Sequence, residues 1–105
     1  MRTDRELLEL AAKALGGEYL DHALGGQYLA FPPSWNGVKW SPLEDDGDAL
    51  RLAVKLGLHV KVCRRVVLVE QRELGDDKIE SLQPDPYAAT RRAIVRAAAE
   101  IGAAM

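Results

Sequence analysis

The sequence predicts a single α+β domain, residues 1–105, in which a mainly antiparallel sheet of four to five strands is sandwiched between helices. Two observations support this fold class. Apolar residues recur with helical spacing near both ends and in the middle of the chain, and the runs between these segments alternate apolar with polar residues. Glycine, proline and aspartate separate the runs, as expected for tight turns. The predicted element order is α-β-β-α-β-β-(β)-α.

The first and last helices have clear start signals. Thr3 and Glu6 form a capping box, and Gly16-Gly17 is expected to end the helix that follows. Asp85-Pro86 places a capping aspartate before a proline at the first helical position of the last helix. The expected apolar face of the last helix comprises Tyr87, Ile94, Ala97, Ala98 and Ile101, and its expected polar face comprises Arg92, Arg96 and Glu100.

Gly25-Gly26 separates two predicted strands, residues 18–24 and 27–31. Two consecutive glycines favour a two-residue type I′ turn, so we expect a tight hairpin at this point. That turn predicts the pairs Leu24–Gln27, His22–Leu29 and Leu20–Phe31, all on the core face.

Pro32-Pro33 ends this hairpin, and residues 34–41 read as a loop that carries Trp35 and Trp40. Trp40 directly precedes a helix start and is expected to cover the core. Trp35 is expected to be exposed. Both are candidate partner-binding residues, because aromatic side chains in loops serve as binding anchors.

The middle helix is predicted from about Asp46 to Leu56, with Asp45 or Asp46 as its cap and Gly57 at its end. Its apolar residues surround most of the cylinder: Ala49, Leu50, Leu52, Ala53, Val54 and Leu56. A helix of this kind is normally covered on more than one side. We therefore expect it to lie between the sheet and a second helix or partner subunit, or to leave an exposed patch used for association.

Residues 58–63 and 66–72 alternate like strands, with Arg64-Arg65 either forming the turn between them or lying within one long strand. A turn there places His59 opposite Glu70, with Lys61 as the diagonal neighbour of Glu70. Residues 75–77 read as a turn and residues 78–82 as a weak final strand.

Two segments resemble a known family. The chain is similar to the phage ABA-sandwich domain, found in small phage and prophage proteins of unknown function, at Trp40, Pro42-Leu43, the run from Asp45 to Leu56 and the terminal run from Ala89 to Ile101. The two segments cover about a third of the chain. The resemblance implies an antiparallel sheet between helical layers, and it carries over no catalytic residue.

The composition argues against several classes of function. The net charge of −2 argues against nucleic-acid binding, which draws most of its affinity from phosphate neutralisation. The single cysteine permits no internal disulfide and no cysteine-based zinc site. The N-terminus lacks the apolar core of a signal peptide, and no apolar run has the length of a membrane span. We expect a cytoplasmic protein, within a bacterial host if it is phage-encoded, with no cofactor and no membrane partner.

Asp45, Asp46 and Asp48, with Glu44, form the strongest candidate site, because clustered carboxylates bind magnesium or calcium. The competing interpretation, which the spacing favours, is that they cap a helix and complement its dipole.

No catalytic motif surrounds His22, His59 or Cys63, and we expect structural histidines and an unreactive, partly buried thiol. The arginines that could form a nucleic-acid face are expected to lie on solvated surfaces: Arg64, Arg65, Arg72, Arg91, Arg92 and Arg96.

The sequence thus favours a non-catalytic binding module of phage or prophage origin, which self-associates or binds another phage or host protein. A small metal-dependent enzyme using Asp45, Asp46 and Asp48 is one alternative. A nucleic-acid accessory protein is another.

Overall fold

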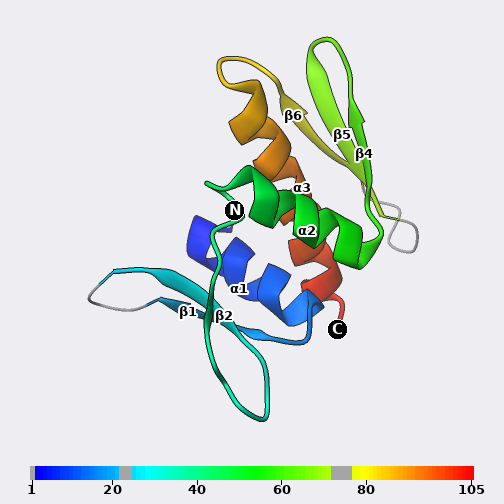
Figure 1. Cartoon of the computed structure of the whole chain (residues 1–105). Coiled ribbons are helices and arrows are strands. Elements are labelled where there is room, and N and C mark those ends of the chain that lie inside the picture. The colour runs from blue at the N-terminus through cyan, green and yellow to red at the C-terminus, as the bar shows by residue number, and fades with distance from the viewer. Residues whose placement is uncertain (1, 22–24, 72–76) are drawn as a thin grey trace.

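The computed structural model describes residues 2–21, 25–71 and 77–105, and within them it confirms an α+β fold with three helices (Figure 1). The described residues form six strands, where the sequence predicted four to five. None of these three helices is long and apolar enough to cross a membrane. In chain order the elements are α1 (Asp4–Ala14), β1 (Glu18–Asp21), β2 (Gln27–Ala30), β3 (Val38–Lys39), α2 (Asp46–Leu56), β4 (His59–Val62), β5 (Val66–Glu70), β6 (Lys78–Ser81) and α3 (Pro86–Ala103).

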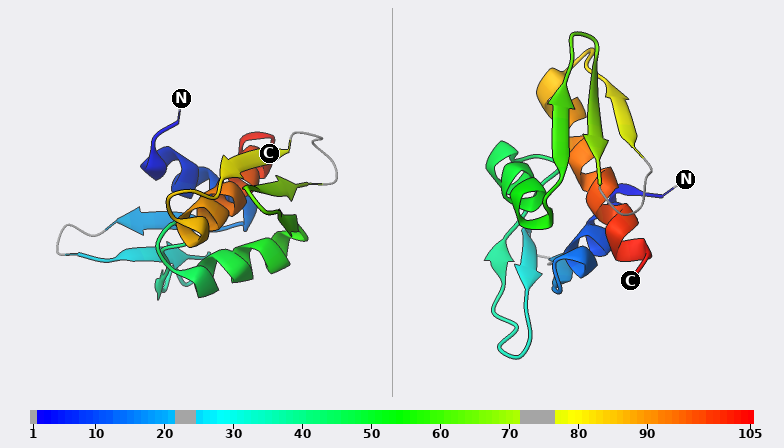
Figure 2. Two further views of the ribbon diagram at one scale, coloured as in Figure 1. Left: turned by 90° about the horizontal axis from the view of Figure 1, so that it is seen from above. Right: turned by 90° about the vertical axis from the view of Figure 1, so that its right-hand side faces the viewer.

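The strands form two sheets, where the sequence predicted one sheet between helices. Sheet A has the order β1-β2-β3 and sheet B the order β4-β5-β6, and all neighbouring strands are antiparallel. The helices lie between the sheets: α1 contacts β1, α3 contacts β5 and β6, and α1 and α3 pack on each other (Figure 2). Within each sheet every strand pairs with its neighbour in sequence, and α2 separates the last strand of sheet A from the first strand of sheet B.

The central element is α3, and α2 is not covered on all sides within the chain. Helix α3 contacts α1, α2 and sheet B. Its small side chains permit this close packing, and at Gly102 an added Cβ would lie 1.9 Å from the carbonyl oxygen of Leu10. Its buried residues are Ala93, Ile94, Val95, Ala97, Ala98, Ala99 and Gly102.

Helix α2 instead buries one face and exposes another. Its buried residues are Ala49, Leu52 and Ala53, whereas Leu50 and Val54 are exposed. Because Leu50 and Val54 are four residues apart, they lie on one side of the helix. The expected alternative, an exposed apolar patch, is therefore the one that the structure shows.

The hairpin of sheet A has a different register from the predicted one. Tyr19 pairs with Leu29, and Leu20 lies opposite Tyr28, not Phe31. Tyr19 and Leu29 are buried, so the core face of β1 is the opposite of the predicted face. The other two predicted pairs, His22–Leu29 and Leu24–Gln27, involve His22 and Leu24, which lie outside the described residues.

The segment predicted as a loop contains a strand. Strand β3 pairs with β2, with Val38 opposite Leu29 and Lys39 opposite Tyr28. Gly37 permits the close approach, because an added Cβ would lie 3.1 Å from Cβ of Tyr28. Two residues give too short a pattern to predict a strand from sequence.

Local signals at the helix ends and in sheet B are confirmed. Thr3 and Glu6 form the capping box, Asp45 and Asp85 cap α2 and α3, and Gly57 ends α2 in the left-handed conformation.

In sheet B, Arg64-Arg65 connects β4 to β5, since the Cys63 amide donates to the Val66 carbonyl. The predicted pairing of His59 with Glu70 is confirmed by the ladder, and the nitrogen Nζ of Lys61 lies 3.2 Å from Oε1 of Glu70. Strand β6 is present, whereas most of the predicted turn at 75–77 lies outside the described residues.

Candidate functional site

An apolar groove of about 530 Å³ lies between α2, β4 and the start of α3. We call it the α2–β4 groove. Its lining is almost entirely hydrocarbon, contributed chiefly by Ala49, Leu50, Val60, Val62, Tyr87 and Ile94.

Strand β4 forms one wall of the groove because it is an edge strand. Val60 and Val62 pair with Val69 and Val67, so all four lie on the face of sheet B that packs toward α3. The two residues of β5 are buried, whereas Val62 is exposed. Among the described residues no further strand pairs with the outer edge of β4, so its apolar side chains face the groove unshielded.

The opposite wall is the side of α2 that carries Ala49 and Leu50, and Tyr87 completes the rim. Leu50, Val62 and Tyr87 each have between 63% and 69% of their surface exposed, and Val54, one turn beyond Leu50 on α2, is also exposed. Tyr87 was expected on the core face of α3; it is exposed, because it lies in the first turn of the helix, before the buried residues begin at Ala93. Isolated exposed apolar residues are ordinary, but a set gathered around one groove marks an interaction site.

The polar side chains of the groove are already engaged. The guanidinium of Arg91 donates to the carboxylate of Asp46, with Nη1 and Oδ1 2.6 Å apart, and its Nε donates to the Leu43 carbonyl at 2.9 Å. The Thr90 hydroxyl donates to the Pro86 carbonyl at 2.8 Å. The groove therefore offers a ligand an apolar surface and no unpaired charge.

The carboxylates of the acidic segment have separate structural roles. Asp45 accepts from the Asp48 amide at 2.8 Å, which caps α2. Asp48 accepts from the Ser41 amide at 2.9 Å and from Arg51 at 2.7 Å. Asp46 pairs with Arg91. Among the residues that the structure describes, no three His, Cys, Asp or Glu side chains form a group that could hold a metal ion. These contacts support the capping interpretation.

The two tryptophans differ in their surroundings. Trp40 is buried and its ring centroid lies 6.3 Å from that of Tyr19, so it belongs to the core. Trp35 is 49% exposed and has a φ of 57°, which is rare for a bulky side chain. It lies in the loop between β2 and β3, at the lower end of the molecule in Figure 1. Of the two predicted anchors, Trp35 is the one that a partner could reach.

The remaining candidates that the structure describes lie at exposed positions of sheet B. Cys63 is exposed, contrary to the expected partial burial, because it lies at the turn where sheet B extends beyond α3. His59 is exposed beside Glu70, with Nδ1 and Oε2 3.7 Å apart. His22 and Arg72 lie outside the described residues. Arg64 and Arg65 occupy an exposed turn.

The arginines of α3 pair with other elements and do not form the expected solvated face. Arg91 pairs with Asp46 of α2, Arg92 with Asp4 of α1, and Arg96 with Glu80 of β6. A helix surrounded by neighbours has no free polar face, so its charged residues meet carboxylates from those neighbours. These ion pairs offset the positive charge of the three arginines of α3.

A second, charged cleft of about 610 Å³ lies between α1, β6 and α3. Glu100 lies at its centre and accepts from Arg2 at 2.9 Å and from Lys78 at 3.3 Å. Burial by itself would raise the pKa of Glu100, but the hydrogen bonds from Lys78 and Arg2 outweigh it and hold the pKa below its ordinary value. The cleft thus contains matched ion pairs that join the N-terminus, sheet B and α3.

Comparison of the chain with models of protein families, with curated proteins and with solved structures finds no match. The residues that sequence reasoning missed are Val60, Val62 and Tyr87. The apolar excess on α2 did indicate one wall of the groove. The edge position of β4 has no local sequence signal, because it depends on which strands and helices lie beside it.

Proposed function

We propose that the protein is a non-catalytic binding module that self-associates through the α2–β4 groove. One observation carries this proposal: three large apolar side chains on three neighbouring elements, Leu50, Val62 and Tyr87, are exposed around one groove. Burying such side chains between protein copies would stabilise the complex by roughly 25 cal/mol for each Å² removed from water. Apolar grooves of this kind are typical of interfaces.

The polar groups of the groove favour binding over catalysis. General acid–base or nucleophilic chemistry needs a side chain that is free to exchange a proton or attack a substrate. Asp46, Arg91 and Thr90 each hydrogen-bond within the protein. A partner would therefore contact an apolar surface, with the Asp46–Arg91 ion pair at its edge.

We extend the proposal to a phage or prophage origin and to action in the cytoplasm of the bacterial host. The basis is the resemblance of residues 42–56 and 89–101 to the phage ABA-sandwich domain. These two segments include α2 and most of α3, which together line much of the groove. Genes for other phage proteins beside the coding gene would support this origin, and a setting among host housekeeping genes would contradict it.

Light scattering coupled to size-exclusion chromatography tests the self-association. We expect the average mass of the wild-type protein to rise with loading concentration and that of Leu50→Glu to stay at one chain. Lys55→Glu is the matched control, because Lys55 is exposed on the same helix, roughly 140° around the axis from Leu50. A wild-type protein that stays at one chain up to about 1 mM would contradict the proposal.

Two titrations separate this proposal from its alternatives. Calorimetry with magnesium, manganese and calcium is expected to show no binding heat, whereas heat that Asp45→Asn abolishes would favour the metal-dependent enzyme. Binding to DNA or RNA that weakens steeply with salt would favour the nucleic-acid accessory protein.

A further inference from the structure

We propose that the occupant of the α2–β4 groove is the loop at residues 31–37 of a second copy of this chain, so that copies join head to tail. We call this loop the aromatic tip. The inference rests on the proposed self-association and specifies which two surfaces meet.

The aromatic tip presents apolar rings on an exposed, ordered turn. Phe31 and Trp35 have 40% and 49% of their surface exposed. The Trp35 amide donates to the Phe31 carbonyl at 2.9 Å, which closes the turn between them. Trp35 also has a positive φ, a conformation that a bulky residue keeps only where its surroundings impose it, and such positions cluster at functional sites.

The groove has the size and lining to receive this tip. Its volume of about 530 Å³ falls within the range of pockets that bury a drug-sized group, which exceeds one indole ring in size. Leu50, Val62 and Tyr87 supply apolar walls that an aromatic ring would contact. Aromatic side chains that enter pockets are the typical anchors of protein interfaces.

The two surfaces also match in charge. Residues 31–38 contain no charged side chain. The charges at the groove, Asp46 and Arg91, neutralise each other. Docking the tip therefore leaves no unpaired charge away from water, which is the usual penalty for burying polar surface. The charged cleft around Glu100 differs, because most of its lining residues are charged and the same loop would separate them from water.

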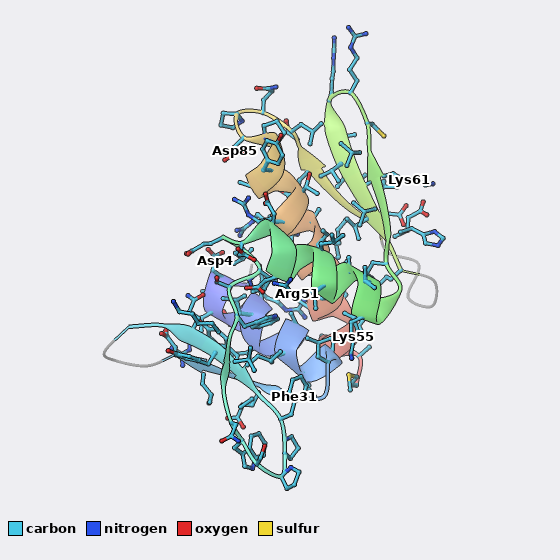
Figure 3. All side chains as sticks on the ribbon, in the orientation of Figure 1. Asp4, Phe31, Arg51, Lys55, Lys61 and Asp85 are labelled. Carbon is cyan, nitrogen blue, oxygen red and sulfur yellow. The ribbon has the colours of Figure 1, made fainter. Side chains whose placement is uncertain are left out.

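The positions of the two surfaces require a head-to-tail arrangement. Phe31 lies at the lower end of the molecule, whereas Lys61 on β4 and Asp85 at the start of α3 lie toward its upper end (Figure 3). The second view in Figure 2 also places the tip and sheet B at opposite ends. One copy cannot fill its own groove with its own tip. Repeating the contact gives a ring or an open chain, as for any heterologous interface.

The contact area predicts a weak and reversible association. A fully buried aromatic side chain contributes about 150–250 Å², so two rings and the groove walls give less than about 1,200 Å² in total. Interfaces of that size belong to transient complexes. We expect dissociation constants on the order of 10 µM to 1 mM.

Sedimentation velocity with complementary variants tests the inference. Trp35→Asn removes the ring and suits the positive φ, because asparagine tolerates that conformation. It keeps an intact groove, while Leu50→Glu keeps an intact tip. We expect each variant alone to sediment as one chain and their equimolar mixture to form a species of two chains and no larger. Circular dichroism and melting curves verify that both variants are folded, and Ser34→Ala is the control for a change at the tip.

The other outcomes are distinguishable. A wild-type protein that sediments as one chain at every concentration overturns both the proposed function and this inference. Association that Leu50→Glu abolishes and Trp35→Asn preserves leaves the proposed function standing and shows that the groove pairs with another surface. Association that Trp35→Asn abolishes and Leu50→Glu preserves shows contact between tips. Either result overturns the head-to-tail arrangement.

Discussion

Arg91 on α3 donates to the carboxylate of Asp46 at the start of α2, with Nη1 and Oδ1 2.6 Å apart. The same guanidinium donates through Nε to the carbonyl of Leu43, just before α2. Arg91 therefore attaches the central helix to the acidic segment that looked most like a site for chemistry. The contact joins the start of α2 to α3, in addition to the packing of the buried face of α2.

Arg91→Met is expected to cost about 1–3 kcal/mol of unfolding free energy, because it leaves the Leu43 carbonyl without its donor. Asp46→Asn is expected to cost less than about 1 kcal/mol, since Asp46 is mostly exposed and surface ion pairs contribute little. Urea denaturation of both variants measures the difference. Equal losses would show that the ion pair, and not the carbonyl contact, carries the stabilisation.

Gly102→Ala is expected to destabilise the protein by about 3 kcal/mol or more, although alanine is the better helix former. The added Cβ would lie 1.9 Å from the Leu10 carbonyl oxygen, so α1 and α3 would have to separate. Gly47→Ala is the matched control, because its Cβ would meet mainly the flexible end of Arg51. Thermal unfolding compares the two, and a Gly102→Ala protein as stable as the control would contradict the close helix contact.

Gln71→Leu is expected to raise the unfolding free energy by about 1–2 kcal/mol. Gln71 is buried, and neither polar atom of its amide has a hydrogen-bond partner among the described residues. Replacing it with a hydrocarbon of similar size removes two polar atoms that lose their water on folding. Urea denaturation measures the change, with exposed Gln83→Leu as the control. A loss of stability in Gln71→Leu would show that the amide has a partner.

Glu100 makes stability depend on pH in the acid range. Its pKa is lowered in the folded protein, so the folded state binds the proton more weakly than the unfolded state. The stabilisation is therefore complete above the ordinary carboxyl pKa and is lost as the pH falls through the lowered value. Glu100→Gln is expected to be less stable than wild type at neutral pH, with a difference that shrinks below about pH 4. Melting temperatures between about pH 7 and about pH 3 check this, with exposed Glu44→Gln as the control. A difference that grows on acidification would contradict the sign.

Features with a local cause could be predicted from the sequence. The capping box at Thr3, the proline start of α3 and the left-handed end of α2 at Gly57 each depend on a few adjacent residues, and all are present. The pairing of His59 with Glu70 could be predicted because a short turn joins two segments that alternate apolar with polar residues, and the β4–β5 ladder contains this pair. Such signals act within a few residues and are independent of the rest of the fold.

Features set by long-range packing could not be predicted. Arg92 and Arg96 look like a solvated stripe in the sequence, but their partners Asp4 and Glu80 come from α1 and β6. The helix mistaken for the central one has larger apolar residues than α3, whose alanines pack closely. The third strand of sheet A consists of Val38 and Lys39 alone and is defined by its pairing with β2, not by a local sequence pattern. For the candidate site, the sequence indicated Leu50 and Val54 but not the opposite wall at Val62.

Amide chemical shifts followed on dilution provide the most direct test that the α2–β4 groove is an association surface. From about 1 mM to about 10 µM, we expect concentration-dependent shifts at Leu50, Val54, Val62 and Tyr87, with none around Glu100. Shifts confined to the charged cleft, or spectra that do not change over that range, would contradict the account.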